Sequence, residues 1–356
     1  MSLLSIDGSM LEGGGQLLRY SIAYSSVTGR PVRVFNIRAK RSNPGLRPQH
    51  MAAIKAAASM CGARVVGLRI GSMEIEYHPG APRGGAYRID VGTAGSVGLI
   101  LQCVSPISAF SPRETHLELR GGTSVRWAVP VVTLANVVWR ILERMGFRGS
   151  IKVLREGFYP RGGGLVRASI TPVRKLNPLR MEERGEVLRV EGVSVCGRLP
   201  RHVAERQARS AERVLREAGY DVDIRVEWHT GPREPLSPGS IISLWAVCSG
   251  GALIGADSLG QRGKPAERVG EEAARSLVSQ LETGMAVDRH TADNLIIWCS
   301  LADGESAFTT SELTMHTITA IELAKMIVGA EFEVEGALGQ PSRIVCRGIG
   351  LENRLL

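Results

Sequence analysis

Apolar residues along the 356-residue chain switch from helical to strand spacing in one recurring order. The first segment predicts helices at 16–29 and 49–62 and strands at 31–37, 73–79 and 85–91. Helical faces repeat apolar residues every three or four positions, whereas half-buried strands alternate every second one. This spacing therefore predicts a compact unit of two helices packed against a small sheet.

The same order returns twice further along the chain. The second segment predicts helices and strands at 96–110, 115–122, 131–146, 150–157 and 164–173. The third predicts them at 293–302, 306–313, 316–329, 331–336 and 342–350. In each segment the second helix closes on a glycine (Gly62, Gly146 and Gly329), a common helix C-terminus. The sequence therefore predicts three related units.

One interval between these glycines is much longer than the other. Gly62 and Gly146 lie 84 residues apart, whereas Gly146 and Gly329 lie 183 apart. The surplus is about the size of a small domain, and residues 181–283 carry their own pattern of strands and two amphipathic helices. We expect repeats one and two in 1–180, an inserted α+β domain in 181–283 and the third repeat in 284–356. The expected fold class is α+β.

Composition is that of an ordinary globular chain, with 44% hydrophobic and 22% charged residues. No apolar run reaches membrane-spanning length and no signal peptide is visible, so the expected location is cytoplasmic. The six cysteines form no CxxC pairs and most lie in apolar segments. They are interpreted as small buried hydrophobes rather than zinc ligands or disulfide partners.

Basic residues exceed acidic ones by 44 to 35, and only six of the 44 are lysine. Arginine presents a planar fork that matches phosphate oxygens, so the excess favours a polyanionic partner such as nucleic acid or nucleotide. Genomic base composition or thermal adaptation is the competing explanation.

Three glycines at 13–15 stand between Glu12 and a predicted helix that carries Gln16 and Arg19. Glycine lets a ligand approach the backbone closely, and a helix N-terminus favours anions. A tight strand-to-helix turn would use the same residues, and both interpretations stay open for this segment alone.

The stretch "IRAKRSNPGLRPQH" gathers four cations, Arg38, Lys40, Arg41 and Arg47, ahead of Gln49 and His50. Its "NPG" interrupts any helix, which makes it a basic loop leading to a helix start. The loop is either a solvated basic segment or a phosphate site. The latter predicts that Arg38→Ala or Arg41→Ala impairs chemistry on ATP.

Two further small-residue turns repeat this logic, "VGTAGSVGLILQ" with Gln102 and "GFYPRGGG" with Arg161. His50 and His316 occupy equivalent places, each opening the second helix of its unit. That equivalence favours a functional role for His316 over a helix-capping or semi-buried histidine.

Together these segments resemble the RNA 3'-terminal phosphate cyclase family over essentially the full length. The resemblance rests on "DGSMLEGGGQLLR", "IRAKRSNPGLRPQH", "GTAGS", "GFYPRGGG", "LPRHVAERQ", "LGQRGKPAERVGEEAA" and "TMHTIT". It implies ATP-dependent conversion of an RNA 3'-phosphate to a 2',3'-cyclic phosphate through a histidine–AMP intermediate. It also implies two-helix, four-stranded repeats like the C-terminal domain of a bacterial translation initiation factor.

By position, the resemblance makes His316 the nucleophile and Glu12 a ligand of a divalent metal, Mg²⁺ or Mn²⁺. It assigns catalytic roles to Arg38, Arg41 and His50. Contacts to ATP are expected from Arg19, Gln16, Gln49, Gln102, His290, Asp293 and Asn294. His290 and Asn294 depart from the tyrosine and glutamine of relatives, which puts the adenine contacts in question.

Expected partners are RNA ending in a 3'-phosphate and, as a candidate assembly, a second copy of the chain. A predicted helix near 201–219 aligns Arg206, Arg209, Arg213 and Arg216 on one stripe. The stripe is either a solvated face laced by glutamates or a contact to the RNA backbone.

Two other functions remain as alternatives. One is a non-catalytic, cyclase-like factor in ribosomal RNA processing, against which His316, Arg38 and Arg41 argue. The other is an enolpyruvyl transferase, a class that lacks the inserted domain and the late histidine motif. Lysine-based nucleotidyl transfer is disfavoured because no K-x-D-G occurs.

Overall fold

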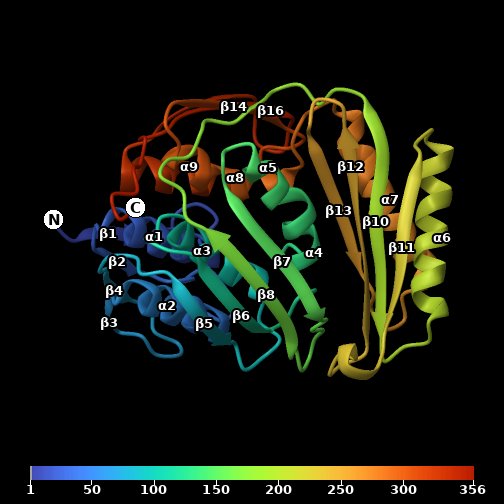
Figure 1. Ribbon diagram of the computed structural model, residues 1–356, viewed down its shortest axis with the longest axis horizontal. Coiled ribbons are helices and arrows are strands. Elements are labelled where there is room, and N and C mark those ends of the chain that lie inside the picture. The colour runs from blue at the N-terminus through green and yellow to red at the C-terminus, as the bar shows by residue number, and fades with distance from the viewer. Residues whose placement is uncertain (1) are drawn as a thin grey trace.

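The computed structural model describes residues 2–356 as four mixed four-stranded sheets combined with helices (Figure 1). The α+β class predicted from spacing is confirmed. Three sheets and their helices form one body, and the fourth sheet stands beside it with two helices of its own. None of the helices within residues 2–356 is long and apolar enough to cross a membrane.

The first sheet has the order β1-β2-β4-β3, with β1 and β2 parallel. Its strands are β1 (Leu4–Asp7), β2 (Val32–Phe35), β3 (Arg64–Val66) and β4 (Ile75–His78). Helices α1 (Gly15–Thr28) and α2 (Pro48–Cys61) accompany it. Each ends at a glycine in the left-handed region, Gly29 at φ 71° and Gly62 at φ 61°, a conformation that glycine adopts without a Cβ clash.

The second sheet has the order β5-β6-β8-β7. Its strands are β5 (Gly85–Asp90), β6 (Thr115–Gly121), β7 (Arg148–Arg155) and β8 (Gly164–Thr171). Its helices are α3 (Val97–Ala109) and a broken segment made of α4 (Val131–Thr133), the π turn η1 (Leu134–Val138) and α5 (Trp139–Glu143). The prediction of one regular helix over 131–146 missed this break, where Asn136 Nδ2 donates to the Val132 carbonyl at 2.8 Å.

The third sheet has the order β15-β16-β14-β9. Its strands are β9 (Arg180–Met181), β14 (Glu305–Thr310), β15 (Glu331–Glu335) and β16 (Ser342–Arg347), and its helices are α8 (Arg289–Leu301) and α9 (Met315–Val328). Because β9 pairs with β14, this sheet draws strands from both sides of the segment expected to be inserted.

The fourth sheet, of order β11-β10-β12-β13, lies entirely within that segment. It comprises β10 (Val187–Gly197), β11 (Val222–His229), β12 (Gly239–Cys248) and β13 (Leu253–Leu259), with helices α6 (His202–Glu217) and α7 (Ala266–Glu282) and the 3₁₀ turn η2 (Gly231–Arg233). Figure 1 places α6 on the outer flank of this sheet, at the opposite end of the molecule from α1.

One strand was placed in the wrong unit by sequence reasoning. Residues 85–91 were expected to close the first sheet, but β5 pairs parallel to β6 in the second. Strand alternation identifies which face is buried and says nothing about which neighbour a strand pairs with. The short strands β1, β3 and β9 were also not predicted.

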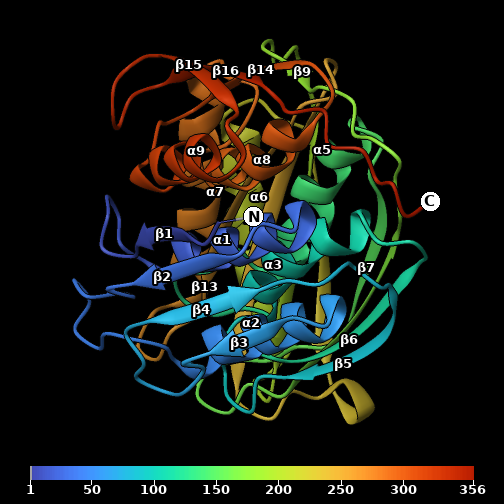
Figure 2. The ribbon, with the colours of Figure 1, turned by 90° about the vertical axis from the view of Figure 1, so that its left-hand side faces the viewer.

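Helix α1 is buried along nearly its whole length, from Gln16 to Ser26, and packs against α2, α3 and α9 (Figure 2). Tyr24 and Ser300 connect it to α8 through a 2.7 Å hydroxyl hydrogen bond. All six cysteines are buried free thiols, as predicted. Because α1 is buried, the polar side chains of its first turn are held next to the ends of neighbouring helices. This position determines where the candidate site forms.

Candidate active site

His316 is the second residue of α9, at a capped helix start. The Thr314 hydroxyl accepts the Thr317 N–H at 3.1 Å, which satisfies one free donor of the first turn. The His316 side chain is 51% exposed. Its Nδ1 lies 3.2 Å from Oε1 of Gln16, in the first turn of α1. The N-termini of α1 and α9 therefore meet at this histidine.

The neighbours of Gln16 define the tautomer of His316. Gln16 Nε2 donates to Asp293 Oδ2 at 3.2 Å, so Oε1 is the atom that faces the imidazole. A carbonyl oxygen only accepts hydrogen bonds, and Nδ1 of His316 therefore carries the hydrogen. Nε2 keeps its lone pair and is the ring atom left to act as a nucleophile.

The electrostatic surroundings keep His316 neutral. Partial burial lowers its pKa below the ordinary value, and the positive charges of Arg19 and Arg41 lower it further. The partial positive charge at the N-terminus of α9 acts in the same direction. A neutral imidazole at pH 7 has the electron pair that attack on phosphorus requires.

Glu12 approaches the same ring nitrogen of His316 as Gln16, with Oε2 3.9 Å from Nδ1. Its Oε1 pairs with the Arg41 guanidinium. Oε2 is buried and has no hydrogen-bond partner among residues 2–356. A Cβ on Gly14 would meet that same oxygen at 2.1 Å, so the glycine makes room for the carboxylate.

A buried row of polar groups continues inward from Gln16. Arg19 donates to Gln102 Oε1 at 3.5 Å, and Gln102 Nε2 donates to Asn294 Oδ1 at 2.5 Å. Asn294 in turn donates to the His290 carbonyl at 2.7 Å. Gln102 and Asn294, both expected to contact ATP, bond to each other here, and their contacts to ATP stay a prediction. Nε of Arg19 is buried without an acceptor in the described part of the chain.

Asp293 connects the two ends of this row, because its Oδ2 accepts from Gln16 and its Oδ1 accepts from Asn294 Nδ2 at 2.8 Å. Its carbonyl accepts from the Tyr20 hydroxyl. Burial and the nearby Asp288 carboxylate raise the pKa of Asp293 to about 7. A buried carboxyl that titrates near neutrality is a frequent mark of a functional site.

His50 closes the site from α2. Its Nδ1 accepts the Arg47 N–H at 3.1 Å, a reciprocal cap of the helix. Burial, reinforced by Arg19, Arg38 and Arg47, lowers its pKa to about 3, so it is neutral at pH 7. A Cβ on Gly15 would approach His50 Nε2 to 2.4 Å, so close packing against His50 requires glycine at this position.

Two arginines of the basic loop before α2, Arg38 and Arg41, make different contacts. Arg38 has φ 55° and donates to the carbonyls of Asn43 and Gly45 at 2.6 and 2.9 Å. It therefore braces its own loop. Arg41 reaches Glu12 instead. Gln49 accepts the Ser96 N–H at 3.3 Å, which ties the start of α2 to the start of α3.

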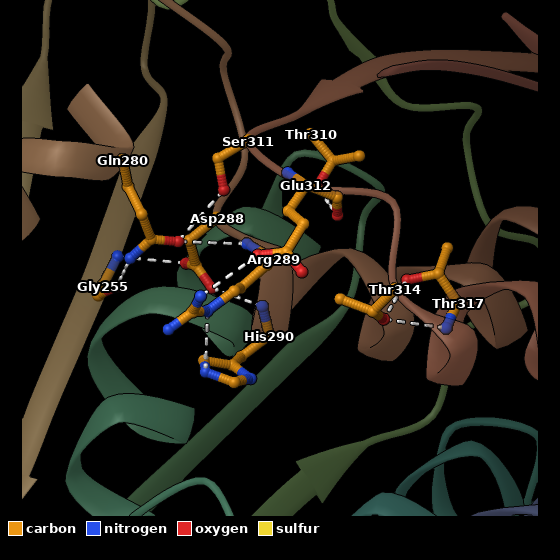
Figure 3. A network of polar contacts seen from close by, with 10 residues as sticks. All are labelled: Gly255, Gln280, Asp288, Arg289, His290, Thr310, Ser311, Glu312, Thr314 and Thr317. Carbon is orange, nitrogen blue, oxygen red and sulfur yellow. Dashed lines mark hydrogen bonds and ion pairs between the residues drawn. The ribbon is translucent and has the colours of Figure 1, made fainter. Parts of the chain in front are cut away.

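A polar network from the fourth sheet supports α8 (Figure 3). Asp288 caps α8 and accepts the Gly255 N–H of β13 at 3.0 Å. Gln280 of α7 accepts from Arg289 N–H and the Ser311 hydroxyl. Sequence reasoning missed this support, although an aspartate before a predicted helix was an available signal. Arg289 Nε donates to the exposed His290 at 3.3 Å.

Two of the four arginines of the stripe on α6 are paired with glutamates. Arg206 forms two hydrogen bonds to Glu267 of α7, at 2.6 and 2.7 Å, and Arg213 pairs with Glu271 at 2.7 Å. The stripe is therefore partly a face laced by glutamates, and the expected RNA contact stays a prediction for its remaining charges.

Comparison with known proteins places the chain among close relatives. A family model described as "RNA 3'-terminal phosphate cyclase" matches residues 10–334. A protein of that name from Ignicoccus hospitalis is 50% identical over 98% of this chain and 99% of its own length. Another, from Methanopyrus kandleri, is 47% identical over 98% and 100%. The enolpyruvyl transferase NikO from Streptomyces tendae, a solved structure, matches at 10% identity with a TM-score of 0.29, covering 98% of this chain and 65% of that one, which is too weak to carry an argument.

Proposed function

The chain belongs to the RNA 3'-terminal phosphate cyclase family, and we propose that it uses ATP to convert the 3'-terminal phosphate of RNA into a 2',3'-cyclic phosphate. One observation carries the proposal: a neutral, half-exposed His316 whose Nδ1 is held by Gln16 and whose Nε2 is free to react.

The first step is attack of His316 Nε2 on the α-phosphorus of ATP. A P–N bond forms at Nε2 and the P–O bond to pyrophosphate breaks. The proton on Nδ1 stays there and is hydrogen-bonded to Gln16 Oε1. Arg19 is the nearby buried cation with an unused donor, suited to the phosphate oxygens.

The second and third steps regenerate the histidine. An oxygen of the RNA 3'-phosphate attacks the phosphorus bonded to His316, the P–N bond breaks, and an RNA–adenylate anhydride forms. The ribose 2'-oxygen then attacks the terminal RNA phosphorus, loses its proton and expels AMP. The 2'-hydroxyl is already beside that phosphorus, so the closure needs no external nucleophile.

The residues at Glu12 fit a divalent cation shared with the nucleotide. Residues 2–356 hold no cluster of three acidic, His or Cys side chains placed for a metal. Mg²⁺ sites beside phosphates often use only one or two carboxylates, and Glu12 Oε2 is a buried oxygen without a partner. Such an ion would neutralise charge on the phosphates, while Arg41 holds the other oxygen of Glu12.

Labelled nucleotide tests the proposal directly. The wild-type protein, incubated with ATP labelled at the α-phosphate and then denatured, should retain an acid-labile adduct, whereas label at the γ-phosphate should not remain. His316→Asn should form no adduct. His116→Asn, at an exposed position of β6, should form the same adduct as the wild type. A normal adduct in His316→Asn would remove His316 from this role.

The non-catalytic alternative, a cyclase-like factor in ribosomal RNA processing, predicts no adduct and no cyclic product from the wild-type protein. The same assay therefore separates the two functions. The free Nε2 of His316 favours the enzyme.

We also propose that the three body sheets are repeats of one unit like the C-terminal domain of a bacterial translation initiation factor. Their strand orders support this, because β1-β2-β4-β3, β5-β6-β8-β7 and β9-β14-β16-β15 share one connectivity. Divisions at 1–180, 181–283 and 284–356 are proposed with it, with one exception: β9 (Arg180–Met181) lies across the first boundary and belongs to the third sheet.

A further inference from the structure

Two aromatic side chains stand in solvent on neighbouring loops. Trp127, between β6 and α4, is 93% exposed, and Tyr159, between β7 and β8, is 79% exposed. Trp127 also has φ 60°, in the left-handed region that large residues avoid. One residue thus carries both backbone strain and an unburied indole, a combination that marks functional positions.

Both loops adjoin the candidate active site. Gln49, beside His50, accepts a hydrogen bond from the Ser96 N–H. The carbonyl of the preceding residue, Gly95, accepts the Gly122 N–H at 2.8 Å. Gly122 opens the loop that carries Trp127. Hydrogen bonds therefore connect the start of α2 to the base of the loop that carries this tryptophan.

The Tyr159 turn lies against the same loop. Thr123 N–H donates to the Gly157 carbonyl at 3.0 Å, and the Thr123 hydroxyl accepts the Gly157 N–H at 2.8 Å. A Cβ on Gly162 would meet the Thr93 carbonyl at 2.6 Å, so this turn also packs on the segment before α3.

Three exposed arginines lie on the two loops or beside them. Arg126 precedes Trp127 and Arg161 follows Tyr159, and Arg126 donates to Gln261 at 2.8 Å, next to Arg262. Within residues 2–356, none of these three arginines forms an ion pair with a carboxylate, unlike Arg206 and Arg213 on α6. Their guanidinium groups remain available to an anion.

We propose that Trp127 and Tyr159 stack the bases that precede the RNA 3'-phosphate, while Arg126, Arg161 and Arg262 bind the backbone phosphates. This inference rests on the proposed function, since it supplies the path by which the RNA end reaches His316. Aromatic faces beside cations are the usual platform for single strands, because every base has a stacking face. A second copy of this chain is the less suitable occupant, because its formal charge of +9 would repel the same arginines.

The test measures binding by fluorescence anisotropy, with a labelled RNA of roughly ten nucleotides, a length within reach of one single-strand site. Its last nucleotide carries a 3'-phosphate and lacks the 2'-hydroxyl, so it cannot cyclise. Trp127→Ala should weaken binding about tenfold, and Trp127→Phe should keep most of the affinity. Leu188→Ala, an exposed apolar residue at the start of β10, is the control and should bind normally.

Two further readouts identify the mode of binding. Affinity for a single nucleoside 3'-phosphate should be unchanged by Trp127→Ala, because no preceding base is present. Arg126→Gln and Arg161→Gln should each lower the slope of log affinity against log salt by about 0.7, the value for one phosphate on a single strand. Arg216→Gln, at the far end of α6, should leave that slope intact.

Wild-type affinity of Trp127→Ala for the longer RNA would overturn the platform. So would sedimentation showing that Trp127→Ala only dissociates a wild-type dimer. Cyclisation by the wild type, assayed in parallel, keeps the two proposals separate. If the wild type cyclises RNA and Trp127→Ala binds RNA with wild-type affinity, only the platform is refuted. A wild type that neither adenylylates nor cyclises refutes the proposed function.

Discussion

Arginine serves opposite purposes at the two ends of this molecule. On α6, Arg206 and Arg213 form partly exposed ion pairs with glutamates of α7 and so connect the two helices. Within residues 2–356, Arg19 of α1 is buried, its side chain forms one hydrogen bond, to an amide oxygen at 3.5 Å, and its Nε has no acceptor. A buried cation that lacks a carboxylate is costly unless an anion arrives. The difference teaches that arginine content alone does not locate a phosphate site, and the lack of an ion pair makes Arg19 the better candidate for one.

Removing the buried cation should have the largest effect on this comparison. Arg19→Gln should lower adenylylation by ATP about 10- to 150-fold, the equivalent of about 1.5–3 kcal/mol for a lost charge-assisted hydrogen bond. Stability should not fall, because a neutral amide can still bond to Gln102. Single-turnover labelling and urea unfolding measure the two effects.

Arg213→Gln is the matched control on α6. It breaks exposed ion pairs and should cost at most about 1 kcal/mol, with normal adenylylation. Equal losses of adenylylation in Arg19→Gln and Arg213→Gln would contradict the distinction between the two regions.

A histidine held neutral beside these cations should make stability depend on pH. The pKa of His50 is about 3 in the folded chain, below its ordinary value of 6.5, so between pH 6.5 and 3 the unfolded chain binds more protons. Stability is therefore complete above pH 6.5 and is lost as pH falls. Between pH 7 and 5 the loss should reach about 2 kcal/mol.

His50→Asn should remove that part of the pH dependence, because asparagine can accept the Arg47 N–H without titrating. Urea unfolding at pH 7, 6 and 5 provides the measurement. His116→Asn on exposed β6 should keep the wild-type slope, and an unchanged slope in His50→Asn would show that another group causes the loss.

Neutralising the α6 stripe should have the smallest effect. Replacing Arg206, Arg209, Arg213 and Arg216 with Gln should leave RNA affinity within about twofold and its salt slope nearly unchanged, because two of the four charges already pair with glutamates. Filter binding at several salt concentrations measures both. A slope reduced by one phosphate or more would return the stripe to the RNA path.

The helices and most strands of this protein were predictable from sequence because their signals are local. Apolar spacing located α1, α2, α3, α8 and α9, and glycines located the ends of α2 and α9. Pairing partners were not predictable, as β5 shows, because the partner of a strand depends on residues distant in sequence. The same holds for β9, a two-residue strand defined only by its contact with β14.

By itself the sequence determined that His316 opens a helix and that arginines and glycines gather at helix starts. Only the tertiary structure decided what those residues do. It turned Arg38 onto its own loop, joined Asn294 to Gln102, and oriented Gln16 between Asp293 and His316. Hydrogen bonds and desolvation act over a few ångströms in space, and residues 16, 293 and 316 become neighbours only when α1, α8 and α9 pack together.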